Sequence, residues 1–229
     1  MTELKRRLLA VLALLAFASV ASYPLAQPLL LKVKGDLFPG VRLVILQPQE
    51  AIITYLKTSI LIGFAFTLPA ITYHLWAFLA PGLLKDEKRM VTTLVIPSAI
   101  MFVTGAAFGY YLLLPATLGF LIDSAAPLAE PMISLDEAVS FVTFILAALG
   151  MVFQMPLASW ALARLGAVSS GDLAAYRRHA IVLIFLAAGV ITPDPSPITQ
   201  ILLALPMMLL YEASIISAKL AGGKDARKR

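Results

Sequence analysis

The chain has 229 residues, of which 60% are hydrophobic and 14% are charged, whereas about 25% of the residues in an average soluble domain are charged. This composition excludes an ordinary soluble domain and indicates an integral membrane protein. Cysteine is absent, which excludes disulfides, thiol nucleophiles and thiolate metal sites. The net charge of +5 does not indicate nucleic-acid binding, because the bases lie at the ends of apolar segments, as in membrane topology.

Six apolar segments follow one another along the chain. A membrane span needs roughly 20 apolar residues, because a rise of about 1.5 Å per residue must cover about 30 Å of hydrocarbon. Four segments meet this length, the fifth is clearly short, and the sixth is interrupted by Pro206. We predict an all-α polytopic fold in a single domain, 1–229, with short fifth and sixth helices. The predicted spans are 8–30, 52–79, 91–114, 138–162, 180–192 and 199–218.

The first segment also has features of a secretory signal peptide. Lys5-Arg6-Arg7 precede an apolar run, and small residues follow at Ala18-Ser19-Val20-Ala21. The apolar run continues past Ala21, and five further segments follow. Its removal would also leave an odd number of spans, so we expect the segment to be kept as the first membrane helix.

Basic residues mark one side of the membrane. They precede the first span, lie in the second and fourth loops and end the tail, whereas the third loop, 115–137, has acids and no base. Loops rich in Lys and Arg stay in the cytoplasm, so we predict that both termini are cytoplasmic. The first loop is the exception, because it is predicted to be external and still contains Lys32, Lys34 and Arg42.

The second loop carries the densest group of charges in the chain. We expect a helix to end at Pro81-Gly82, and the charged run Lys85-Asp86-Glu87-Lys88-Arg89 follows. A chain so poor in charge does not need this run to join two helices, which makes the loop a candidate for binding cargo. The alternative is a local ion pair between Glu87 and Lys88 or Arg89, worth at most about 1 kcal/mol at a surface.

Two charged residues, one Lys and one Glu, lie within the spans, where a charge costs roughly 2.5 to 3.5 kcal/mol near the bilayer centre. Lys57 lies near the outer end of the second span, and we expect its long stem to reach the interface. Glu212 lies within the sixth segment, and its stem is too short for this. It could pair with a base of the tail, receive a polar group of a partner, or bind a proton.

Uncharged residues also shape the spans. Gln154 brings an amide into the fourth span. The amide has two alternative roles, a hydrogen bond to another helix or a contact with a molecule that enters from the membrane. Proline lies within the second, third, fourth and sixth spans, and each proline removes a backbone hydrogen bond and bends its helix. We therefore expect a bent bundle with a concave face, shaped by Pro69, Pro97, Pro156 and Pro206.

Motifs of catalysis are missing from the sequence. His74 and His179 are far apart and form no metal motif, and no nucleophile elbow, phosphate-binding loop or zinc-protease motif occurs. We expect no enzymatic activity, no metal and no cofactor. A small-molecule secondary transporter remains the alternative function, although such proteins often contain inverted repeats and none is evident here.

A series of short motifs extends over nearly the whole chain. In order, they are Glu3-Leu4-Lys5-Arg6-Arg7-Leu8, Pro48-Gln49-Glu50, Tyr55-Leu56-Lys57-Thr58-Ser59, Pro69, Trp76 to Leu83 with Glu87-Lys88-Arg89, Phe108-Gly109-Tyr110-Tyr111 with Pro115, Gly150 to Pro156, Thr192-Pro193 with Gln200, and Pro206 with Tyr211-Glu212. Together they resemble the TatC family, the multi-spanning core of the twin-arginine protein translocase. The chain departs from the family pattern at Lys5, where arginine is usual, at Gln154, where glutamate is usual, and around Asp194.

The resemblance implies a function in protein export. Members of this family bind twin-arginine signal peptides of folded precursor proteins, work with single-span TatA- and TatB-type subunits in an oligomeric complex, and are driven by the proton-motive force without nucleotide. They lie in the inner membrane of prokaryotes, with both termini in the cytoplasm.

The resemblance also assigns residues. It implies signal-peptide binding by Glu87, Glu3, Phe78 and Lys5, since carboxylates bind guanidinium groups in bidentate geometry. Gln154, Glu212 and Gln200 are then intramembrane polar or partner contacts. The structural prolines are Pro48, Pro69, Pro81, Pro156 and Pro206.

Overall fold

The computed structural model describes the backbone of residues 2–79, 85–125, 130, 132–192 and 197–222, and their side chains except those of residues 2–4, 76–79 and 85–92. The chain divides into two compact units, Met1–Ala147 (unit 1) and Ala148–Arg229 (unit 2), which are described one at a time. Helix α6 (Leu135–Val152) begins in unit 1 and ends in unit 2. A single domain over 1–229 therefore stays a prediction.

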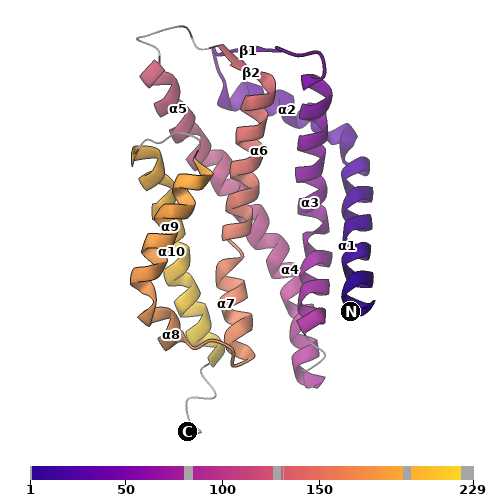
Figure 1. Ribbon diagram of the computed structural model, residues 1–229, viewed down its shortest axis with the longest axis vertical. Coiled ribbons are helices and arrows are strands. Elements are labelled where there is room, and N and C mark those ends of the chain that lie inside the picture. Colours follow the sequence, from indigo (N-terminus) through magenta and orange to yellow (C-terminus); the bar gives the residue numbers. More distant parts are fainter. Residues whose placement is uncertain (1, 80–84, 126–129, 131, 193–196, 223–229) are drawn as a thin grey trace. The chain divides into compact units, whose positions relative to one another are not determined.

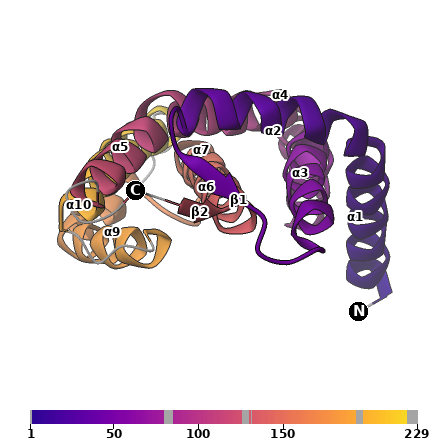
Figure 2. The same cartoon turned by 90° about the horizontal axis from the view of Figure 1, so that it is seen from above.

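Unit 1 begins with a bent pair of helices, α1 (Thr2–Ala21) and α2 (Tyr23–Leu37), which meet at an angle of 63°. The bend lies at Ser22, two residues before Pro24 in the first turn of α2. Proline has no N–H and a fixed φ, which suits a first turn and favours a new helix direction here. The predicted first span, 8–30, therefore contains this bend, and α2 runs across the end of α3 (Glu50–Leu79) rather than along it (Figures 1 and 2).

Helix α1 packs along α3 (Figure 1), and a glycine permits the close approach. A Cβ atom added to Gly63 of α3 would lie 2.6 Å from the backbone nitrogen of Ser19 in α1. Such a distance is far below van der Waals contact, so this helix pair requires a residue without a side chain at position 63.

The third long segment of unit 1 is α4 (Lys85–Phe108), the π-helical turn η2 (Gly109–Leu113) and α5 (Leu114–Ala125). The Tyr110 hydroxyl in η2 donates to Asp36 of α2 at 2.6 Å, and the Lys32 ammonium lies 6.0 Å from the centre of the Tyr110 ring. A π turn widens the helix by one residue. Here it carries the ring that fixes α2 to the third segment.

A short parallel sheet completes unit 1. Strand β1 (Arg42–Val44) pairs with β2 (Met132–Ser134), in the register Arg42 to Met132 and Val44 to Ser134 (Figure 2). The hydroxyl of Ser134 also donates to the buried carboxylate of Glu50 at 3.3 Å. This hydrogen bond links the start of α3 to the strand that precedes α6.

Unit 2 contains α7 (Met155–Arg164), α8 (Ser170–Ala175), α9 (Arg177–Ile191) and α10 (Pro197–Gly222). Helix α10 packs on α7, α8 and α9 through small buried residues, which let helix backbones approach closely in membranes. They include Ala161, Ala188, Ala204 and Ala218. Helix α10 has 26 residues, so it extends beyond the predicted segment 199–218 at both ends, and it continues through Pro206.

The helices confirm the predicted all-α polytopic fold class. Within the described residues, four stretches are long and apolar enough to cross a membrane, and the bent α1–α2 pair would be a fifth span. Helix α9 has only 15 residues, in line with the predicted short fifth helix. Prolines 69, 97 and 206 lie inside α3, α4 and α10.

Candidate functional site

The residues predicted to bind cargo lie on three helix ends of unit 1. Glu3 is in the first turn of α1, Phe78 in the last turn of α3 and Glu87 in the first turn of α4. Their side chains lie outside the described residues, as does Pro81 as a whole, while the side chain of Lys5 is described and exposed.

The packing of unit 1 brings these three helix ends to one end of the unit. Helix α3 packs against both α1 and α4. Figure 1 shows the start of α1, the end of α3 and the start of α4 at the same end of unit 1. The backbone positions of two acids and one aromatic residue, far apart in the sequence, therefore share this end.

Gln154 lies at the break between α6 and α7, as the residue that precedes the first turn of α7. Its side-chain amide donates to the carbonyl of Gly150 at 3.3 Å, and the side chain is half-buried. Pro156 is buried in the first turn of α7, where its missing N–H costs nothing. The Gln154 amide thus has a partner in a backbone carbonyl one turn earlier in the chain.

Glu212 of α10 is paired with Arg177, the first residue of α9. Two parallel hydrogen bonds join them, from Nε to Oε1 and from a terminal guanidinium nitrogen to Oε2, both 2.8 Å long. We expected a pairing with a base of the tail as one possibility; among the described residues the base is instead on α9. Because both side chains are about half exposed, the pair orients the two helices more than it stabilises them.

Gln200, in the first turns of α10, bonds to the backbone of α9. Its side-chain amide donates to the carbonyl of Phe185 at 2.7 Å. Gly189 leaves room for this contact, because a Cβ atom there would lie 3.1 Å from the Gln200 amide nitrogen. The residue predicted as a partner contact thus also joins two helices within unit 2.

Lys57 has a partner that the sequence interpretation missed. Its ammonium group lies 2.6 Å from the carboxylate of Asp136 and 2.7 Å from the hydroxyl of Ser140, at the start of α6. Both charged side chains are about one-third exposed. A base in the second span and an acid at the expected outer end of the fourth span should lie at similar membrane depth, and this signal could have predicted the pair.

The remaining predicted prolines have structural positions. Pro48 lies in the turn before α3, where the Glu50 N–H donates to the carbonyl of Gln47 at 3.0 Å. Pro69 and Pro206 lie inside long helices that continue past them.

Comparison with known proteins gives one consistent result. The family described as Sec-independent protein translocase protein (TatC) matches residues 1–206. A TatC of Aquifex aeolicus is 38% identical over 189 residues, which cover 82% of this chain and 78% of the relative. A TatC of Helicobacter pylori is 34% identical over 218 residues, covering 95% and 85%, and the chloroplastic TATC of Pisum sativum is 37% identical over 183 residues, covering 80% and 52%.

A solved structure is similar to the chain over almost its full length. The crystal structure described as the twin arginine translocase receptor TatC superposes with a TM-score of 0.84 at 34% identity. The match covers 96% of this chain and 98% of the solved chain.

Proposed function

We propose a function from the premise that this chain belongs to the TatC family of Sec-independent protein translocase proteins. It is a multi-pass membrane protein of a translocase and not an enzyme. The comparisons give no support to the alternative of a small-molecule transporter. The chain acts as the receptor for twin-arginine signal peptides and as the core of a translocase that exports folded proteins, driven by the proton-motive force.

One observation supports the location of the receptor site. The start of α1, the end of α3 and the start of α4 lie at one end of unit 1 (Figure 1), which places Glu3, Phe78 and Glu87 on neighbouring helix ends. Two carboxylates can bind a pair of guanidinium groups, each through two parallel hydrogen bonds. Phe78 would add apolar packing, and the exposed Lys5 side chain is a further proposed contact for the signal peptide. This end of unit 1 is the proposed cytoplasmic site for the arginine pair.

The proposed orientation follows from charge. The bases before the first span and in the second and fourth loops put both termini on the cytoplasmic side of a prokaryotic inner membrane. The proposed partners are single-span subunits of the TatA and TatB type, within an oligomeric complex. Gln200 and Glu212 are candidate contacts for them, and Gln154 can offer such a partner hydrogen bonds but no charge.

A binding experiment with paired peptides tests the receptor function. The full chain, reconstituted in nanodiscs, is titrated with a signal peptide that carries two arginines and with the same peptide carrying two lysines. We expect the arginine peptide to bind at least tenfold more tightly, because lysine cannot form the bidentate contact. Glu87→Ala should lower the affinity for the arginine peptide about 10- to 100-fold, which is the effect expected from losing a hydrogen bond between charged groups.

The matched control is Glu130→Ala, which removes an exposed acid outside the proposed site. This variant should bind the arginine peptide like the unmodified chain. Equal affinity for the two peptides, or undiminished affinity in Glu87→Ala, would contradict the proposed function.

A further inference from the structure

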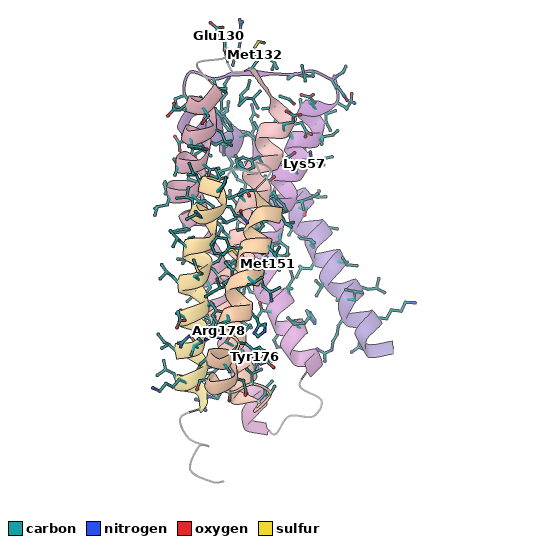
Figure 3. All side chains as sticks on the ribbon, turned by 60° about the vertical axis from the view of Figure 1, so that its left-hand side comes forward. Lys57, Glu130, Met132, Met151, Tyr176 and Arg178 are labelled. Atoms are coloured by element: carbon teal, nitrogen blue, oxygen red, sulfur yellow. The ribbon has the colours of Figure 1, made fainter. Side chains whose placement is uncertain are left out.

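One end of unit 2 is rich in bases and aromatic rings. Here α7 ends at Arg164, α9 begins with Arg177 and Arg178, and the last turn of α10 contains Lys219. The short helix α8 connects α7 with α9 at this end (Figure 1). Figure 3 shows Tyr176 and Arg178 close to each other there. We call this end of unit 2, with Trp160, Arg164, Tyr176, Arg178 and Lys219, the basic platform.

Hydrogen bonds hold the helix ends of the basic platform together. The Tyr211 hydroxyl of α10 donates to the carbonyl of Leu173 in α8 at 2.7 Å. The two parallel bonds from Arg177 to Glu212 join α9 to α10. The N-terminus of helix α8 is capped by reciprocal hydrogen bonds between Ser169 and Asp172. The bases at this end are thus carried by a fixed arrangement of helices.

The acids near the platform already accept hydrogen bonds from other groups of unit 2. In the described part of unit 2 they are Asp172 and Glu212. Asp172 accepts from the backbone and side chain of Ser169 at 2.9 and 2.7 Å, and Glu212 accepts from Arg177 with both oxygens. Three exposed bases remain without an acidic partner in this described part, namely Arg164, Arg178 and Lys219. The platform therefore presents unneutralised positive charge.

Aromatic rings accompany these bases at the boundary of the apolar helices. The guanidinium of Arg164 lies 5.3 Å from the centre of the Trp160 ring, and Tyr176 is 63% exposed directly before the first base of α9. Trp and Tyr gather at the level of lipid headgroups, and Arg binds phosphate through paired N–H donors. The apolar part of α9 begins at Ala180, so Arg178 lies at the level where hydrocarbon gives way to headgroups.

We propose that the basic platform binds the headgroups of anionic phospholipids. Arg164, Arg178 and Lys219 bind the phosphates, while Trp160 and Tyr176 lie beside the lipid glycerol. A cluster of unpaired bases repels a signal peptide that carries an arginine pair, so the platform is a different site from the proposed receptor. Lipid binding at the platform does not require the proposed receptor function, because it depends only on the geometry and charge of unit 2.

Quenching of Trp160 fluorescence by brominated lipids tests this proposal. The chain has two tryptophans, so Trp76→Phe leaves Trp160 as the single fluorophore. The full chain with this change is reconstituted in vesicles of zwitterionic phosphatidylcholine that contain either brominated phosphatidylglycerol or brominated phosphatidylcholine. We expect the affinity of phosphatidylglycerol for the Trp160 environment to be at least about fivefold higher than that of phosphatidylcholine. A factor of about five corresponds to the attraction between one base and an anionic surface.

Two charge variants separate the platform from general electrostatics. Arg178→Gln with Lys219→Gln should lower the relative affinity for phosphatidylglycerol about fivefold, so that little of the preference remains. Lys34→Gln with Arg42→Gln removes equal charge from unit 1 and should leave the quenching unchanged. Equal quenching by both lipids, or the same loss in both double variants, would overturn the proposal. Loss of the preference on addition of glycerol phosphate would also overturn it, since the site would then bind a free anion.

Discussion

Lys57 joins two segments of unit 1 at the scale of single residues. Its ammonium group bonds to both Asp136 and Ser140, so a cationic side chain in an apolar helix has two polar partners. Pairing lowers the cost of placing each charge near hydrocarbon. The sequence analysis assigned Lys57 only a side chain that reaches the interface. The similar expected depth of Asp136, 79 residues away, was the available signal for the pair.

A double-mutant cycle measures this pair. Lys57→Met and Asp136→Asn should each lower the free energy of unfolding, because each leaves the other group without its charged partner. The coupling energy should be about 1 kcal/mol, the upper part of the range for partly exposed ion pairs. The measurement is reversible denaturation in mixed micelles. Additive effects of the two changes would show that the pair contributes nothing.

Glu212 and Gln200 show what could be predicted at single residues. Glu212 was singled out as an acid in an apolar segment and Gln200 through the family resemblance, and both need only the sequence. Their partners, Arg177 and the carbonyl of Phe185, depend on how α9 and α10 pack, so they could not be predicted in the same way. The side chains of Glu3, Phe78 and Glu87 lie outside the described residues, so their roles stay predictions.

At the scale of elements, close packing of α1 on α3 requires Gly63. Apolar segments predict helices, but they do not predict which helices touch or where a backbone must pass within contact distance of another. The strands β1 and β2 were not predicted either. Each has three residues, and they pair across almost 90 residues of chain, so neither leaves a usable pattern in the sequence.

Two glycine substitutions test the packing of α1 on α3. Gly63→Ala should lower the free energy of unfolding by about 1–3 kcal/mol, because the new methyl group overlaps the Ser19 backbone. Gly119→Ala, in α5, meets no atom within 4 Å and should be neutral or stabilising by up to about 1 kcal/mol through helix propensity. Denaturation in mixed micelles compares the two variants. A Gly63→Ala protein as stable as the Gly119→Ala protein would exclude the close contact.

Helix α8 should depend on pH through its first turn. Hydrogen bonds from the Ser169 side chain and backbone lower the pKa of Asp172 below its ordinary value of 3.8. A lowered pKa means that the folded state favours the carboxylate. Its contribution is therefore complete above the ordinary pKa and is lost as the pH falls through the lowered value. Amide exchange of residues 170–175, corrected for the intrinsic rate, should lose protection below about pH 3.8.

The matched variant is Asp172→Asn, which should have weaker protection in α8 and no change over the same pH range. Protection in the unmodified chain that stays constant through this range would show that the carboxylate does not stabilise the helix.

At the scale of the whole molecule, membrane class, helical fold and family could all be predicted from the sequence. Long apolar segments must form helices in a bilayer, because every backbone polar group needs an internal partner there. The bend at Ser22 could not be predicted, because a proline begins α2 there, whereas Pro206 is tolerated inside α10. The comparisons confirm the translocase family, while the membrane orientation and the receptor residues stay proposals.

The most direct test of the receptor site is a photocrosslink from position 78 to a twin-arginine signal peptide bound to the full chain in nanodiscs. Phe78 is replaced by a photoreactive phenylalanine analogue, which keeps the ring, and Met132 in β2 is replaced likewise as the control, because it is exposed and lies outside the proposed site. We predict a crosslink from position 78 that fades when the peptide carries two lysines, and none from position 132. Crosslinks of equal yield from both positions would contradict a receptor site at this end of unit 1. The same holds if position 78 gives equal yields with the arginine peptide and the lysine peptide.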